Sequence, residues 1–496
     1  MSIANNTPEY HFTIFAPNSA NKLFQLLDER LMPRVFLIIF DKIGKIKITP
    51  PQYEHYCSKE IDILSETLNL NNINEEEFNF YYNKINDSKE KNDPNTILFL
   101  KSQLLFKQKE KQISDYINSI SINEGYFSFC SKIFFAENQI YIIVVQLQTL
   151  IINEYYSLTK DILYSIISDL PKSLFQSVVN HYINKFILLL KNNDFINNVD
   201  LIRSENIHEI LHLAGSSLIG SISCTINNAF FDLFEKINEI SSLKYEKIVC
   251  NGKLILSQPT NKSIIYEITF KDPIPLDNIR RIRKLMEITS EKLHLICDAQ
   301  NSYGLGYVNY NNYTGEDENV FEIIITGFNH WSLIHNNNGL MDVENGIARL
   351  SKPKINKITF YNEYNKTFNN ISSSKIDELF EIIKIAFEQK KGTMILITEN
   401  AEEESIRLKN QCINVTPFKI NNKYLFEMTK IDGAIIINNA LQCYAFGAIL
   451  DGVASSHGDS SRGARYNSAL TYKNSKTNKC FLIVISEDNT IDFIHN

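Results

Sequence analysis

The chain has 496 residues, of which 44% are apolar and 22% are charged, and its formal net charge is −7. This composition excludes a disordered chain and is typical of a folded globular protein. The acidic balance argues against a nucleic acid polymer as partner, because such partners require a basic face. A chain of this length exceeds a single core, so two or three domains are expected.

The eight cysteines are scattered, and no two are spaced as a Cys-x-x-Cys pair. A disulfide scaffold or a cysteine-rich zinc site is therefore not expected. The first residues contain no basic segment followed by an apolar stretch, and the longest apolar runs, such as 140–145 and 186–190, are too short to cross a bilayer. These features predict a cytoplasmic protein that does not enter a membrane.

Residues 1–200 show the weakest pattern. Short apolar runs at 35–40 and 140–146 predict strands, and 162–190 predicts one or two amphipathic helices. A polar stretch at about 59–96 lies between these elements. We expect a mixed or mainly helical N-terminal domain, and no motif in it indicates a role.

Residues 203–345 predict an α+β middle domain, either separate from or integral to the module that follows. Helices are predicted at 205–220, 229–240 and 277–289, and strands at 253–256, 263–270, 293–297 and 321–325. Asp277 is the expected N-cap of the third helix, because its side chain can accept a hydrogen bond from the first turn.

A His-Glu-x-x-His motif lies in the first of these helices, at His208, Glu209 and His212. On a helix the two histidines share a face that can hold zinc, with Glu209 as the general base of a metallopeptidase. The third histidine of one such class would fall at 218, which is Leu218. A lone short motif more often marks a solvated helix face. A zinc metallopeptidase is therefore a remote alternative.

Residues 350–496 give the clearest pattern, and the predicted fold class is α/β (α+β). The predicted elements are a helix at 376–387, a strand at 394–398, a helix at 401–409, strands at 433–437 and 441–447, a helix from 464 and a strand at 481–486. Asn438 and Asn439 separate the two middle strands and are typical hairpin-turn residues.

The residues around this hairpin are suited to a nucleotide. Asp432 precedes a strand and is followed by Gly433, so its carboxylate can reach a divalent cation while a ligand approaches the backbone. A polar loop at 451–463 then delivers Arg462 and Arg465 to the start of a helix. A helix N-terminus and two arginines both favour phosphate.

These residues also carry a family resemblance. Asp432-Gly433-Ala434 resembles the Asp-Gly-Ala motif of the diadenylate cyclase (DisA-type) domain family. The stretch 463–469, Gly-Ala-Arg-Tyr-Asn-Ser-Ala, is similar to that family's Gly-[Thr/Ala]-Arg-His-Arg-x-Ala, and 486–488 is similar to its late Ser-Glu-Glu/Asp element.

The resemblance is closest to a longer, sensor-type branch with an extra N-terminal region. It is good over about 370–496, weaker over 205–350 and absent before 200. It implies a mixed sheet flanked by helices, and a homo-oligomer in which two domains face each other and condense two ATP molecules into cyclic di-AMP with Mg²⁺ or Mn²⁺.

The resemblance also assigns residues to the site. Asp432 would hold the catalytic metal, Glu487 would support it, and Arg465 would contact phosphate. The nucleotide would lie against Gly433, Ala434, Asp451, Gly452, Arg462, Gly463, Ala464, Tyr466, Asn467 and Ser468.

The chain departs from the family at one point, because Tyr466-Asn467 stands where the family has His-Arg. Loss of one placed donor can cost about 10²–10³ in rate, since phosphoryl transfer depends on stabilising the developing charge. Arg462, or His457 in the same loop, could compensate. Two hypotheses stay open: a diadenylate cyclase, favoured here, and a sensor that binds a nucleotide or cyclic dinucleotide without turnover.

Overall fold

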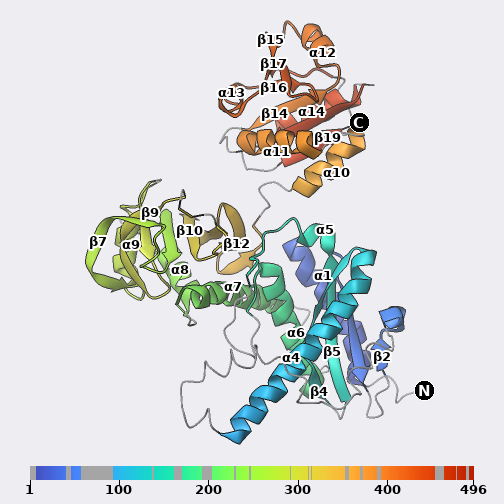
Figure 1. The fold of residues 1–496 in the computed structure, drawn as a ribbon, viewed down its shortest axis with the longest axis vertical. Coiled ribbons are helices and arrows are strands. Elements are labelled where there is room, and N and C mark those ends of the chain that lie inside the picture. Colours follow the sequence, from blue (N-terminus) through green and yellow to red (C-terminus); the bar gives the residue numbers. More distant parts are fainter. Residues whose placement is uncertain are drawn as a thin grey trace. The chain divides into compact units, whose positions relative to one another are not determined.

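The computed structural model divides into two compact units, Met1–Lys352 and Pro353–Asn496. Figure 1 shows the elements of each. The described residues are 7–40, 46–56, 93–136, 139–160, 170–192, 204–227, 229, 231–244, 247–290, 292–310, 312–313, 315–351, 357–368, 373–387, 392–452, 463–475, 478–486 and 491–495.

The first unit begins with a five-stranded antiparallel sheet in the order β2-β1-β5-β3, with β4 paired to β5. The strands are β1 (Arg34–Phe40), β2 (Ile46–Thr49), β3 (Tyr126–Cys130), β4 (Phe134–Ala136) and β5 (Gln139–Gln148). The predicted strands at 35–40 and 140–146 are confirmed as β1 and β5. Short segments η2 (Pro51–Tyr56), η5 (Ile122–Glu124) and α5 (Thr149–Ile152) connect the larger elements.

Both faces of this sheet are covered, which explains why β1 is buried almost throughout. Its odd-numbered residues pack in the main core with α1 (Pro8–Leu27) and α6 (Leu174–Asn192), and its even-numbered residues pack against α4 (Pro94–Ser121). The predicted helix at 162–190 is confirmed in its second half as α6, and 161–169 lie outside the described residues. The sequence pattern does not predict α1 or α4.

An eight-stranded sheet completes the first unit, in the order β13-β12-β11-β10-β6-β8-β9-β7. Its strands are β6 (Gly252–Ser257), β7 (Ile264–Pro275), β8 (His294–Cys297), β9 (Asn301–Val308), β10 (Val320–Gly327), β11 (His330–His335), β12 (Asn338–Glu344) and β13 (Ile347–Arg349). The four strands predicted for this region are confirmed as β6, β7, β8 and β10. The β6–β8 pair is parallel, and the other pairs are antiparallel.

Helix α7 (Ser204–Asn227) links the two sheets of the first unit, because its apolar side chains belong to the same core as those of α6 and of α8 (Leu233–Ser242). Within the described residues, α7 is the one helix long and apolar enough to cross a membrane. Two-thirds of its most apolar window, 67%, is buried inside the unit, which is the usual position of a core helix.

The basic segment predicted as a helix from Asp277 forms α9 (Ile279–Met286), but its N-cap is a different residue. Asn278 accepts the hydrogen bond from the backbone N–H of Arg281, whereas Asp277 pairs with Lys236 at 2.7 Å. The prediction of Asp277 as N-cap was therefore wrong by one position. Both residue types cap helices, and an ion pair to another helix is not visible in the local sequence.

The second unit is a six-stranded mixed sheet in the order β15-β17-β16-β14-β18-β19. Its strands are β14 (Thr393–Thr398), β15 (Ile413–Lys419), β16 (Ala434–Ile437), β17 (Gln442–Ala448), β18 (Cys480–Ile485) and β19 (Ile491–His495). The β14–β16 pair is parallel and the others are antiparallel. The predicted hairpin is confirmed as β16 and β17.

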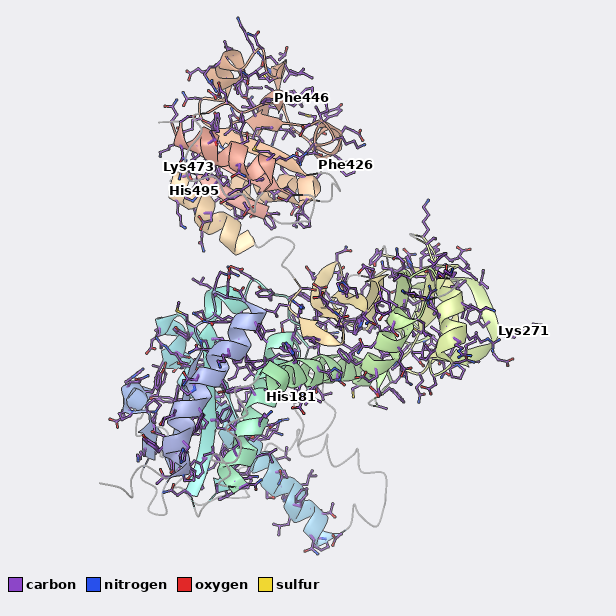
Figure 2. All side chains as sticks on the ribbon, turned by 180° about the vertical axis from the view of Figure 1, so that it is seen from behind. His181, Lys271, Phe426, Phe446, Lys473 and His495 are labelled. Atoms are coloured by element: carbon purple, nitrogen blue, oxygen red, sulfur yellow. The ribbon has the colours of Figure 1, made fainter. Side chains whose placement is uncertain are left out.

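Helices cover both faces of this sheet. Helices α10 (Lys357–Thr367), α11 (Ser373–Phe387) and α13 (Asn422–Met428) enclose one apolar core, and α12 (Ala401–Arg407) and α14 (Ala464–Asn474) enclose the other. Figure 2 shows this unit from behind, with Phe426 on α13, Phe446 on β17 and Lys473 on α14 labelled. The predicted fold class, a mixed sheet flanked by helices in an α+β arrangement, is confirmed.

Candidate functional site

Asp432 and Arg465 lie next to each other in the second unit, although 33 positions separate them. Asp432 stands just before β16, and Arg465 lies in the first turn of α14. Arg465 Nη2 donates a hydrogen bond to Asp432 Oδ1 at 3.1 Å. The side chain of Asp432 is 89% exposed, whereas that of Arg465 is 31% exposed. The fold thus brings together the two predicted catalytic residues, with the carboxylate facing solvent.

Gly433 allows the chain to turn into β16 at this point. Its φ is +105°, a conformation that residues with a side chain rarely adopt. A Cβ on Gly433 would lie 2.6 Å from the carbonyl carbon of Gly447 in β17. The backbone N–H of Gly433 also donates to Asp432 Oδ1 at 3.1 Å. Glycine at 433 therefore positions the carboxylate, and Ala434 follows as the first, fully buried residue of β16.

Gly392, just before β14, also shapes the site. A Cβ there would lie 2.7 Å from Arg465 Nη1 and 3.0 Å from the carbonyl oxygen of Ile485. The guanidinium of Arg465 therefore rests against backbone at the start of the central strand. Gly392 was not predicted as a residue of the site, and the available signal was a glycine immediately before a buried strand.

Asp451 forms a two-point ion pair with Arg407 at the end of α12. Arg407 Nη2 lies 2.5 Å from Asp451 Oδ1, and Nη1 lies 2.7 Å from Oδ2. Arg407 also contacts Glu404, which accepts a hydrogen bond from the hydroxyl of Tyr472 at 2.6 Å. The hydrogen bonds to Glu404 and then to Asp451 raise the pKa of Arg407. This network, which sequence reasoning missed, fixes the chain where the polar loop begins.

Gly452 and Ser468 attach the same stretch to α14. A Cβ on Gly452 would lie 2.5 Å from the carbonyl oxygen of Thr471, and Ser468 Oγ donates to the carbonyl oxygen of Leu450 at 3.3 Å. The predicted roles of Asp451, Gly452 and Ser468 in nucleotide binding stay predictions. Gly452 lies against Thr471, Ser468 lies in the second turn of α14, and Asp451 is paired with Arg407 of α12, so none of the three is in the first turn of α14.

The first turn of α14 presents its backbone N–H groups next to Arg465. Gly463 is the N-cap and makes no side-chain cap, and Ala464 is the first helical residue. Asn467 Nδ2 donates to the carbonyl oxygen of Gly463 at 3.4 Å, and Tyr466 packs partly buried against the apolar core beneath α14. A helix start of this kind favours an anion through its dipole and its N–H groups.

The other predicted residues of this site, Arg462, His457 and Glu487, lie outside the described residues. Within the described ranges, no three His, Cys, Asp or Glu side chains gather as metal ligands. Mg²⁺ bound to a nucleotide does not need such a group, because one or two carboxylates and the phosphate oxygens complete its shell. Asp432 fits that requirement, since both of its described hydrogen bonds go to Oδ1 and the side chain is open to solvent.

The His-Glu-x-x-His motif is placed on α7, far in the chain from this site. His212 Nε2 lies 2.8 Å from Glu235 Oε1, and its Nδ1 lies 2.9 Å from the carbonyl oxygen of Gly346. Glu209 faces Lys185 at 3.7 Å. Both nitrogens of His212 are therefore directed at protein oxygens, and the described part of α7 forms no metal cluster with its surroundings.

Three family models match the chain in succession. The model of the DisA bacterial checkpoint controller nucleotide-binding (DAC) domain matches residues 383–496, which contain Asp432 and Arg465. The probable sensor domain DACNG matches residues 8–219, and the probable sensor domain DACNH matches residues 231–337. No curated protein matches the chain significantly.

Two solved structures are similar to part of the chain. One is a double mutant of DacA from Staphylococcus aureus, with 19% identity, a TM-score of 0.21 and coverage of 24% of this chain and 83% of its own. The other is described as a hypothetical membrane-spanning protein from Bacillus cereus, with 16% identity, a TM-score of 0.23 and coverage of 28% and 70%. The three matches confirm the predicted resemblance: residues 383–496 match the DAC (DisA nucleotide-binding) domain, and the segments before them match the probable sensor domains DACNG and DACNH.

Proposed function

We propose that the second unit binds ATP with Mg²⁺ or Mn²⁺ and condenses two ATP molecules into cyclic di-AMP. The observation that supports this most is the contact between Asp432 and Arg465 at the N-terminus of α14, inside a segment that matches the DAC family model. A carboxylate for a cation lies there beside an arginine and a helix start for phosphate.

Each of these groups has a defined task in the proposed reaction. Asp432 would hold the cation, which neutralises phosphate charge when it is bound. Arg465 would exchange its bond to Asp432 for a phosphate oxygen, since arginine binds both anions with the same donors. This exchange would free Asp432 Oδ1 for the cation at the moment when the nucleotide arrives. The N–H groups at the start of α14 would hold the phosphates in place.

The proposed reaction requires a second copy of the domain. Each ATP 3′-hydroxyl attacks the α-phosphate of the other ATP and releases pyrophosphate, so two ATP molecules yield one cyclic di-AMP and two pyrophosphates. One Asp432 and one Arg465 serve one ATP, and two domains must therefore face each other. We accordingly propose a homo-oligomer as the active form.

A second function is favoured by Tyr466 and Asn467. These residues place an aromatic ring and an amide in the first turn of α14, next to Arg465. Neither carries a positive charge for the transition state, and electrostatic stabilisation is the main source of rate in phosphoryl transfer. A domain with this turn can bind a nucleotide or cyclic dinucleotide as a sensor without turning it over.

One experiment separates these functions. The purified full chain is incubated with ATP and Mn²⁺, the products are separated by chromatography, and the Asp432→Asn variant serves as control. Cyclic di-AMP formed by the native chain and lost in the variant supports the cyclase. Saturable nucleotide binding without product supports the sensor. Absence of both product and binding overturns the nucleotide site itself.

A further inference from the structure

An open pocket of about 370 Å³ lies on the eight-stranded sheet, within the segment that matches the probable sensor domain DACNH. Lys253, His294 and Glu322 line it from the neighbouring strands β6, β8 and β10. Lys292 and Tyr310, in the adjoining loops, also line the pocket. Pockets of this size bind small molecules.

The pocket occupies the sheet face opposite to the main core. Side chains alternate along a strand, so Leu254 and Leu295 point into the main core while Ile255 and Ile296 form a separate small cluster on the other face. Lys253 and His294 lie two positions before Ile255 and Ile296, so their side chains are on this second face. The apolar cluster thus continues directly into a polar, concave area.

The carboxylate in the pocket is already paired. Glu322 is 5% exposed, and its Oε2 lies 2.5 Å from Lys253 Nζ. The hydroxyl of Tyr310 donates to its Oε1. Both carboxylate oxygens therefore have partners, and a ligand finds no open anionic group on this wall.

The donors of the pocket are in excess. Lys253 uses one of its three N–H groups for Glu322. Lys292 forms no ion pair within the part of the chain that the structure describes, and His294, which is 7% exposed, has a buried Nδ1 with no hydrogen-bond partner. Buried polar groups in native proteins normally have partners, so the unpaired ring nitrogen indicates a missing partner, and the two lysines beside it favour a partner that carries negative charge.

We propose that this pocket binds a small organic anion, with its carboxylate or phosphate group held by Lys253, Lys292 and His294 and its remaining atoms filling the rest of the volume. The pocket is distinct from the nucleotide site, since it lies in the first unit. Small organic anions would then be the ligands of the segment that matches the probable sensor domain DACNH. Burial, and then the charge of Lys253, lower the pKa of His294 to about 4, so the imidazole in the free pocket is neutral. Its ring N–H would donate a hydrogen bond to the anion.

An NMR titration tests the proposal in the full chain, labelled with ¹³C at histidine Cε1. The chain has ten histidines, and His294→Gln identifies the relevant resonance. The probes are phenyl phosphate, benzoate and benzyl alcohol, which share a ring and differ in the head group. We expect a saturable shift of the His294 resonance with at least one of the two anions and none with the neutral alcohol. The anion with the lower Kd distinguishes a phosphate ligand from a carboxylate ligand.

Lys292→Met is the decisive variant, because its exposed side chain has no structural partner among the described residues and its loss does not threaten folding. Binding of the anion should weaken about tenfold, the value of one charged hydrogen bond. Lys271→Met is the matched control: this lysine is exposed on β7 of the same sheet, is labelled in Figure 2 and does not line the pocket. The affinity of the Lys271→Met variant for the anion should equal that of the native chain.

Three results would overturn the proposal: no shift with either anion, an equal response to benzyl alcohol, or an unchanged Kd in Lys292→Met. Because the readout is local to His294, binding of phenyl phosphate at the nucleotide site of the second unit does not produce it. Failure of the cyclase assay leaves this result unaffected.

Discussion

The guanidinium of Arg465 donates a hydrogen bond to Asp432 across 3.1 Å, and the carboxylate that receives it is 89% exposed. An ion pair in such an exposed position contributes about 0–1 kcal/mol to stability, because water screens it and both side chains lose freedom. Gly433 and Gly392 nevertheless fix the geometry of this pair. A ligand site explains that arrangement better than folding stability does. In the proposed function, the two residues hold each other in place until a ligand replaces their contact.

The Asp432→Asn variant should separate function from stability. Since the side chain is exposed, the free energy of unfolding should change by less than about 0.5 kcal/mol. The amide cannot hold a divalent cation as a carboxylate does, so cyclic di-AMP formation should be lost. Urea unfolding and the product assay measure the two effects on the same preparation. Retained product formation would show that Asp432 is not the metal carboxylate.

Local chemistry made much of the second unit predictable. The strand around 394–398, the hairpin with its Asn438-Asn439 turn and the helix start at Ala464 all follow from short-range periodicity, turn residues and a glycine. Asp432 and Arg465 were identified through motifs attached to these same elements. The structure shows in addition that the two side chains form a hydrogen bond.

The remainder depends on long-range pairing. The strand order of the eight-stranded sheet places β6 between β10 and β8, and periodicity in one strand carries no information on its neighbour. Arg407 and Asp451 are 44 positions apart, so their ion pair leaves no local signal. The buried His294 likewise looks like an ordinary strand residue until its neighbours on other strands are known.

Gly433→Ala should destabilise the second unit by about 1–3 kcal/mol. The new Cβ would lie 2.6 Å from the Gly447 backbone, and the φ of +105° is unfavourable for alanine. Gly463→Ala is the matched control, because its φ is −65° and a Cβ there has no atom within 4 Å. The control should cost less than about 1 kcal/mol, the range of a changed N-cap. Equal unfolding midpoints in urea for the two variants would refute the proposed close approach.

Glu318 should make the first unit less stable in acid. Burial by itself raises the pKa of this carboxyl, but hydrogen bonds from the backbone N–H groups of Thr159 and Lys160 and from the Thr159 hydroxyl outweigh it and set the pKa below its ordinary value. A depressed pKa stabilises the fold fully above the unfolded-state value of 4.5, and this contribution disappears as the pH falls through the folded-state pKa.

Glu318→Gln should therefore lower the free energy of unfolding at pH 7 by about 1–3 kcal/mol and flatten its decline below pH 4.5. Asp317→Asn is the control, since its side chain is 72% exposed and its contact with Lys160 is 3.5 Å long. That change should shift stability by less than about 0.5 kcal/mol. Denaturation series at several pH values measure both variants, and parallel curves for Glu318→Gln and the native chain would contradict the assignment.

The double variant Tyr466→His, Asn467→Arg tests whether the first turn of α14 limits turnover. It adds an imidazole and a guanidinium beside Arg465, where negative charge develops on the phosphates in the proposed reaction. If the native chain is a slow cyclase, the rate of cyclic di-AMP formation should rise, by up to about 10²–10³ for one well-placed donor. Loss of the partly buried Tyr466 ring should cost some stability, which thermal unfolding would record.

The control for this gain is Lys473→Arg, a change that keeps the charge and lies in the last turn of the same helix (Figure 2). Its rate should equal that of the native chain. A double variant that binds ATP, stays folded and forms cyclic di-AMP no faster than the native chain would show that Tyr466 and Asn467 do not limit the chemistry. The low positive charge of this turn would then be a feature of a nucleotide sensor, in which binding by Arg465 and the helix N-terminus is sufficient.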